Sequence, residues 1–144
     1  MKDAFILLAD DEVQFVEAMT KRLNKRGLQV VSSLSGEKAL ARMDSHHNLD
    51  VVILNIKMPG MDGIQTLQEM KKRFPLVEVI MLTGHRTIES AVEGMKLGAF
   101  DYLIKPCDID ELVHKVQEAV AQKREHEERI RDAASQYASC TSFD

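Results

Sequence analysis

The sequence lacks the features of a membrane or secreted protein. No apolar run approaches the roughly 20 residues that a membrane-spanning helix needs. The N-terminal stretch MKDAFILLADDE has a single lysine and a short apolar run that ends at acidic residues. It is too short for a signal peptide and has no small-residue cleavage site. These absences predict a cytoplasmic protein with no membrane partner.

Cysteine and clustered positive charge are also scarce. The two cysteines, Cys107 and Cys140, form no metal-binding spacing, so we expect two free thiols. The formal net charge is −4 and no segment is dominated by lysine and arginine. This balance argues against direct nucleic-acid binding by the chain.

What is present is an alternation of short apolar runs and helical periodicity. The 144 residues suffice for one domain with a core of its own. The runs that predict strands are residues 4–9, 28–33, 50–55, 77–83 and 100–105. The segments between them, and the segment from residue 108 onward, carry apolar residues at helical spacing. In the fourth helix we expect Thr87 as the cap, Gly98 as the stop, and Ile88, Ala91, Val92 and Met95 facing inward.

Five strand–helix repeats predict an α/β fold with a doubly wound parallel sheet in the order 2-1-3-4-5. A closed eight-stranded barrel would need about 250 residues. In open parallel sheets, ligands bind at the carboxyl ends of the strands. The side chains at those ends are Asp10, Asp11, Asn55, Thr83 and Lys105.

These residue types suit a site for a divalent cation and an anion. Acidic oxygens beside a backbone carbonyl are ligands that Mg²⁺ prefers, and Lys105 can supply a fixed counter-charge. Simpler interpretations exist for each residue alone. Asp10 and Asp11 can cap a helix, and Thr83 can be an ordinary strand residue. The Lys105 side chain can extend to solvent. The Lys105–Pro106 peptide bond can be cis or trans.

The motifs taken together resemble one family. LLADDE, VVILNIKMPGMDG, VIMLTGH and GAFDYLIKP occur in the order and spacing of the receiver domain of bacterial two-component response regulators. The resemblance covers about residues 5–120 and implies a flavodoxin-like receiver fold. The stretch GHRTIESAVEGMKLGAFDYLIKP most resembles receivers attached to AAA+ enhancer-binding transcription activators.

The resemblance implies a role for each matching position. Mg²⁺ would be bound by Asp10, Asp11, the residue at position 55 and the backbone carbonyl of Lys57. Lys105 would contact the phosphoryl group. The switch pair would be Thr83 and Tyr102. It also implies a sensor histidine kinase or phosphotransfer protein as partner. A homodimer would form through residues 88–97, the fifth strand and residues 112–120. Such a domain is not an enzyme, because it catalyses only its own phosphorylation and dephosphorylation.

Asn55 departs from the family pattern, which has an aspartate at the end of the third strand. A carboxylate oxygen is the nucleophile that forms an aspartyl phosphate, and an amide has no such reactivity. Two origins account for Asn55: an aspartate replaced in the laboratory to block phosphorylation, or a natural pseudo-receiver that acts through protein binding alone. The intact Thr83, Tyr102 and Lys105 favour the first. A small hydrolase or phosphatase with an acidic metal site is a third interpretation, but it requires further acids.

Composition changes after about residue 121, which predicts a receiver over 1–121 and a helical extension or linker over 122–144 with a frayed tail. A heptad seam through this segment would run along Val116, Val120, Lys123, Glu127, Ile130, Ala134 and Tyr137. It supports either a solvated helix or a weak coiled coil. The segment is too short for an output domain, so we expect a stand-alone receiver or the front of a longer regulator.

Overall fold

A computed structural model describes residues 4–84 and 87–141. The strands are β1 (Phe5–Ala9), β2 (Gln29–Ser33), β3 (Val51–Asn55), β4 (Glu78–Thr83) and β5 (Asp101–Ile104). The helices are α1 (Val13–Lys25), α2 (Gly36–Ser45), α3 (Gly63–Arg73), α4 (Ile88–Lys96) and α5 (Ile109–Thr141). Strands and helices alternate along the chain, as the sequence predicts.

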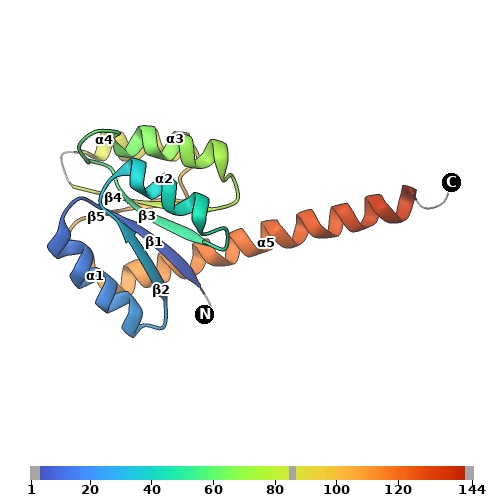
Figure 1. The fold of residues 1–144 in the computed structure, drawn as a ribbon, viewed down its shortest axis with the longest axis horizontal. Coiled ribbons are helices and arrows are strands. Elements are labelled where there is room, and N and C mark those ends of the chain that lie inside the picture. Colours follow the sequence, from blue (N-terminus) through green and yellow to red (C-terminus); the bar gives the residue numbers. More distant parts are fainter. Residues whose placement is uncertain (1–3, 85–86, 142–144) are drawn as a thin grey trace.

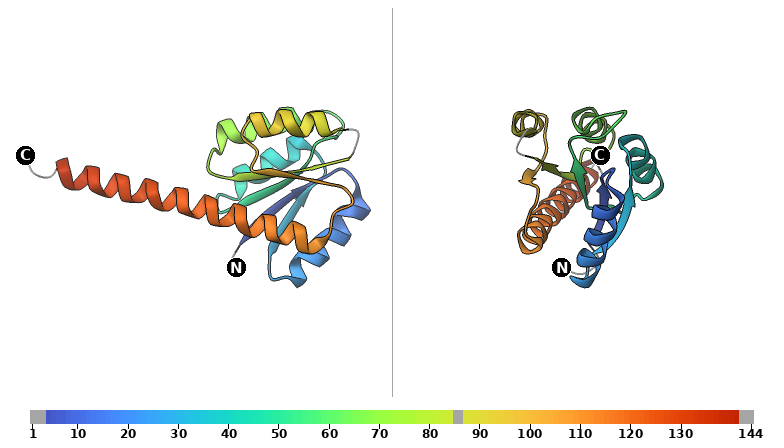
Figure 2. Two further views of the ribbon diagram at one scale, coloured as in Figure 1. Left: turned by 180° about the vertical axis from the view of Figure 1, so that it is seen from behind. Right: turned by 90° about the vertical axis from the view of Figure 1, so that its left-hand side faces the viewer.

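The five strands form one parallel sheet in the order β2-β1-β3-β4-β5, which confirms the predicted topology. Helices α2, α3 and α4 cover one face of the sheet, and α1 and α5 cover the other (Figures 1 and 2). Because β1 and β3 are neighbours, the residues that follow β1 lie beside Asn55 at the end of β3. This is the point where the strand order reverses, and it is where a doubly wound sheet binds ligands.

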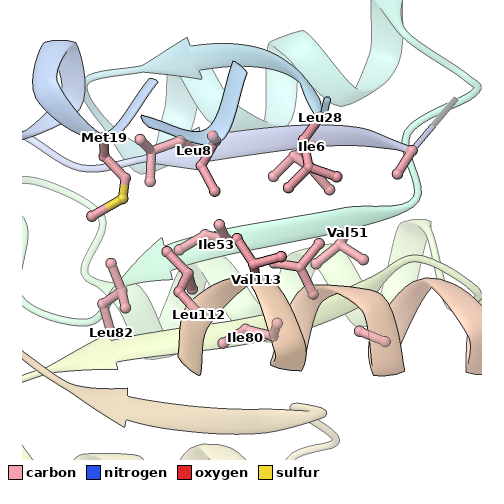
Figure 3. Packing of buried hydrophobic residues seen from close by; sticks show 14 of the residues in the cluster. Ile6, Leu8, Met19, Leu28, Val51, Ile53, Ile80, Leu82, Leu112 and Val113 are labelled. Carbon is pink, nitrogen blue, oxygen red and sulfur yellow. The ribbon is translucent and has the colours of Figure 1, made fainter. Parts of the chain in front are cut away.

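Each face of the sheet buries its own apolar cluster. Strand residues such as Ile6, Ile53 and Ile80 pack against Leu112 and Val113 of α5 on one side (Figure 3). Alternate residues of the same strands pack against α2, α3 and α4 on the other side. The central strands are therefore apolar on both faces, which explains their continuous hydrophobic runs.

Local sequence signals fix several helix ends. Ser35 caps α2 by accepting a hydrogen bond from the Lys38 amide at 3.2 Å. Asp62 and Gln65 form a reciprocal capping box at the start of α3. Gly27, just after α1, adopts a positive φ of 84°, a conformation that favours glycine.

The expected inward face of α4 is only partly correct. The prediction fails for Ile88, Val92 and Met95, which are 38%, 48% and 38% exposed. It holds for Ala91, which α4 buries together with Gly94. A Cβ atom on Gly94 would overlap the sulfur of Met81. Helix α4 therefore lies close to the sheet on its small residues, and its large apolar residues stay at the surface.

Helix α5 continues past the sheet and projects from the body of the molecule (Figures 1 and 2). The part of α5 that leaves the sheet is held by Asp50, a buried residue. The Asp50 carboxylate also accepts a hydrogen bond from the Phe5 amide at 3.0 Å. The Lys123 ammonium and the Arg124 guanidinium lie 3.4 and 3.3 Å from the same carboxylate. The first three positions of the heptad seam are Val116, Val120 and Lys123. They pack within the domain, because both valines are fully buried and Lys123 is only 6% exposed.

Beyond this anchor the helix is open to solvent. Ile130 and Tyr137 are 55% and 72% exposed. Within the described ranges, no helix combines the length and the apolar character needed to cross a bilayer. Cys107 is a free thiol, whereas the side chain of Cys140 lies outside the part of the chain that is described.

Candidate functional site

Acidic side chains from the end of β1 meet Asn55 from the end of β3. Asp10 is fully buried, Asp11 is half-buried, and Asn55 is 7% exposed. The Asn55 side-chain nitrogen lies 3.3 Å from an oxygen of Asp10 and 3.3 Å from an oxygen of Asp11. The same nitrogen donates to the backbone carbonyl of Lys57 at 3.0 Å. Residues separated by more than forty positions in the sequence thus converge on one atom.

This convergence explains how Asn55 is accommodated. Three oxygen acceptors surround its amide group, and the amide NH₂ is the only part of the side chain that can donate to them. A carboxylate at the same position would present a fourth acceptor and a further negative charge. Asn55 therefore replaces repulsion with hydrogen bonds at the acidic end of the sheet.

Lys105 supplies the positive charge of the site. Its ammonium lies 2.6 Å from the second oxygen of Asp10 and 3.4 Å from a Glu12 oxygen. The Lys105 side chain is 18% exposed, so the ion pair with the fully buried Asp10 carboxylate is largely shielded from water. The Lys105–Pro106 bond is cis, one of the two isomers that the sequence allowed.

The chain after β3 forms one wall of the site. An open hollow of about 560 Å³ is lined by Asp11, Glu12, Asn55, Lys57, Met58, Pro59, Gly84 and Lys105. The wall is held in place at Gly63, whose amide donates to the Ile56 carbonyl at 2.7 Å. A Cβ atom at Gly63 would overlap the Ile56 backbone, so this turn requires glycine.

The proposed switch residues lie apart from this convergence. Thr83 is 1% exposed, and its hydroxyl contacts the Gly84 carbonyl at 3.1 Å and the Thr87 hydroxyl. Tyr102 is half-buried and packs in part against the cluster on the α4 side of the sheet. The structure therefore groups Asp10, Asp11, Asn55, Lys57 and Lys105, and directs the Thr83 hydroxyl toward the start of α4.

Three contacts at the site were not predicted from the sequence. The Lys105 ammonium lies 4.1 Å from the centroid of the Phe15 ring, which is within the range of a cation–π interaction. Glu12 reaches the same ammonium. Glu37, from α2, accepts the Met61 amide at 2.9 Å and so ties the wall of the site to a neighbouring helix. Only Glu12 had a signal in the sequence, because it extends the run of acidic residues after β1.

The donors present suit a hard cation. The oxygens of Asp10 and Asp11 and the carbonyl of Lys57 share one neighbouring atom, and all three are ligand types that Mg²⁺ accepts. Turning the Asn55 amide would present its oxygen as a fourth donor, which is neutral. Within the described residues no group of three or more histidines, cysteines and acids is placed to bind a metal.

Known proteins share this arrangement of strands and motifs. Residues 6–117 match the sequence profile of the response regulator receiver domain. The transcriptional regulatory protein ZraR of Salmonella typhimurium is 38% identical over 120 residues, covering 83% of this chain and 27% of that protein. The DNA-binding transcriptional regulator NtrC of the same species is 35% identical over 128 residues, covering 89% and 27% respectively.

The fold agrees with an experimental structure from this group. The crystal structure of a response regulator receiver domain protein from Clostridium thermocellum aligns with a TM-score of 0.81 at 36% identity. The alignment covers 84% of this chain and 97% of that one. The chain thus spans about a quarter of the length of the two curated regulators, but nearly the whole of this receiver structure.

Proposed function

Because the chain belongs to the response regulator receiver domain family, and so to the signalling domains of two-component phosphorelays, we propose that position 55 is its phosphoacceptor position and that Asn55 blocks phosphorylation. The observation that supports this proposal is the convergence of Asp10, Asp11 and the Lys57 carbonyl on the Asn55 side chain. A nucleophile at that point would lie beside both the acidic pair and the Lys105 ammonium.

With aspartate at position 55, a carboxylate oxygen attacks the phosphorus of the donor, and the bond from phosphorus to the leaving group breaks. Asp10, Asp11 and the Lys57 carbonyl would hold Mg²⁺, which when bound offsets negative charge on the phosphoryl oxygens. Lys105, already fixed by Asp10, would contact a phosphoryl oxygen with its ammonium group. The residues position and neutralise the reactants, and the products are the phosphorylated domain and the dephosphorylated donor. We therefore infer that the chain does not turn over an external substrate.

Asn55 removes the nucleophile and leaves the surrounding charges in place. Its neutral amide lowers the negative charge available to Mg²⁺, so we expect weaker metal binding than in an aspartate form. An aspartate replaced by design and a natural pseudo-receiver both fit these properties. The retained Lys105 contact with Asp10 favours the first, because a lineage without phosphorylation has no need of that lysine in the site.

We propose Thr83 and Tyr102 as the pair that would respond to phosphorylation. Thr83 would turn its hydroxyl from Gly84 and Thr87 toward the phosphoryl group, and the half-buried Tyr102 ring would move inward. Support comes from their positions, since Thr83 ends β4 and Tyr102 lies on the adjacent β5.

The partners proposed are a histidine kinase or phosphotransfer protein and a second copy of the chain. The second copy would bind at the face formed by α4, β5 and α5. The exposed side chains of Ile88, Val92 and Met95 support this choice, because α4 presents them to solvent instead of the core. The two curated regulators also suggest that such a domain serves a longer transcription regulator.

Intact-mass spectrometry tests the phosphoacceptor proposal. The Asn55→Asp variant and the unchanged protein are each incubated with phosphoramidate and Mg²⁺. We expect the mass of one phosphoryl group on the variant and none on the unchanged protein. A variant that remains unmodified, with circular dichroism showing that it is folded, would overturn the proposal and favour the phosphorylation-independent interaction module.

A further inference from the structure

A second hollow lies at the far edge of the sheet, between β2 and α2. Its volume is about 590 Å³, and it is lined by Ser32, Ser33, Leu34, Lys38, Ala41, Arg42 and Ser45. It shares no lining residue with the hollow around Asn55. Because β2 is an edge strand, this hollow opens to solvent along the side of the domain.

The α2 wall of the hollow is positively charged. Lys38, Arg42 and Ser45 recur at steps of four and three, so they lie on one side of the helix. The two acidic residues of α2 are engaged elsewhere. Asp44 pairs with Arg73 of α3 at 2.6 Å, and Glu37 accepts an amide of the loop after β3. The lysine and arginine therefore face the hollow without a carboxylate from their own helix.

The β2 wall contributes a buried hydroxyl that has no partner. Ser33 is 6% exposed, and among the described residues its hydroxyl oxygen makes no hydrogen bond. Ser33 lies on the same face of the sheet as Val31, which packs against the cluster beneath α2. Buried hydroxyls normally find a partner. A ligand oxygen in the hollow would supply one, and Ser45 would not compete for it because its hydroxyl already bonds to the Ala41 and Arg42 carbonyls.

We propose that this hollow binds a small molecule that carries a phosphoryl group. Lys38 and Arg42 line the hollow on one wall and Ser33 on the other. An ammonium, a guanidinium and a hydroxyl suit a tetrahedral oxyanion with several acceptor oxygens. The hollow is far larger than a phosphate ion, and Leu34, which is 39% exposed, offers an apolar surface for the rest of the ligand. The site is separate from the phosphoacceptor position and does not depend on the function proposed for it.

Titration of the ¹⁵N-labelled protein with phenyl phosphate, followed by amide NMR shifts, tests the proposal. Inorganic phosphate tests the oxyanion alone, and benzoate tests a planar carboxylate with the same ring. We expect saturable shifts in residues 32–45, with phenyl phosphate binding more tightly than either comparison compound. The Lys38→Ala/Arg42→Ala double variant and the Ser33→Ala variant should each raise Kd about tenfold or more.

The matched control is Lys21→Ala/Lys25→Ala, which removes two exposed basic residues at the same spacing from α1. It should leave Kd unchanged. Shifts that do not saturate, that lie only around Lys105, or that weaken equally in the control would overturn the proposal. Ser33→Ala keeps every charge, so an unchanged Kd in that variant would also contradict a site that uses the buried hydroxyl.

Discussion

Replacing Asn55 with aspartate should destabilise the metal-free domain. The Asn55 side-chain nitrogen lies 3.3 Å from oxygens of Asp10 and Asp11 and 3.0 Å from the Lys57 carbonyl. A carboxylate oxygen at that point would face three acceptors and donate to none of them. The substitution therefore removes the amide hydrogen bonds and adds a third negative charge in one step.

The size of the effect follows from these distances. With carboxylate charge centres about 4–5 Å apart and an effective dielectric constant near 20, each like-charged pair is repelled by about 3–4 kcal/mol. Attraction to Lys105, solvent screening and partial protonation reduce this to a net loss of about 1–2 kcal/mol. For a domain of this length, we expect the Tm to fall by about 3–8 °C.

Calorimetric melting with a chelator, and then with Mg²⁺, measures the effect. Mg²⁺ at about ten times its Kd should restore about 1.4 kcal/mol to the Asn55→Asp variant and less to the present protein. Asn48→Asp is the matched control, because it adds the same charge at an exposed position before β3. Equal melting of the Asn55→Asp variant and the present protein without Mg²⁺, or an equal Mg²⁺ response in the Asn48→Asp control, would refute the repulsion argument.

Three other substitutions test the surroundings of the site. In an Asn55→Asp background, Phe15→Leu should slow phosphorylation by phosphoramidate about threefold to fivefold, because the loss of a cation–π contact of about 0.5–1 kcal/mol leaves Lys105 less firmly placed. Phe15→Tyr should preserve the rate. The Glu37 carboxyl accepts hydrogen bonds from the Glu37 backbone amide and from the Met61 amide, and these bonds lower its pKa. The stability that the ionised Glu37 carboxylate contributes is therefore fully present above its ordinary pKa of about 4.5, and it is lost as the pH falls through the lower pKa of the folded state. Glu37→Gln should therefore make the Tm fall less steeply in that acidic range. Gly63→Ala should cost about 1–3 kcal/mol in urea unfolding, because its Cβ would overlap the backbone of Ile56.

Each of these has an outcome that would contradict it. Equal rates for the leucine and tyrosine variants would show that Phe15 contributes only packing or nothing. An acid melting profile that is unchanged by Glu37→Gln would mean that the hydrogen bond to Met61 does not contribute to stability. A Gly63→Ala variant with unaltered unfolding would show that the turn relaxes freely.

The strand order and the proximity of the side chains at the strand ends could be predicted because both follow from short-range patterns. Continuous apolar runs mark buried parallel strands, and topology then places Asp10 and Asp11 beside Asn55 without any knowledge of side-chain contacts. The burial of α4 could not be predicted in this way. Its apolar spacing suggested that Ile88 and Val92 face inward, but helix depth is set by Gly94 against Met81, a contact between distant residues.

The same limit applies to the extended helix and to Phe15. The heptad pattern of α5 does not reveal that Lys123 is held by Asp50, since that ion pair joins residues 73 positions apart. Likewise, Phe15 is an unremarkable aromatic residue until the fold brings the Lys105 ammonium over its ring. Periodicity identifies the elements, whereas the contacts that set their depth and direction depend on the assembled fold.

The most direct test of the account is to locate the phosphoryl group after reaction of the Asn55→Asp variant with phosphoramidate and Mg²⁺. Peptide mapping by mass spectrometry distinguishes position 55 from Asp10, Asp11 and Glu12, which lie on a different part of the chain. The account predicts modification at position 55 alone, and a large loss of the reaction rate in the additional Lys105→Ala variant. Modification at one of the acids after β1, or none at all, would contradict it.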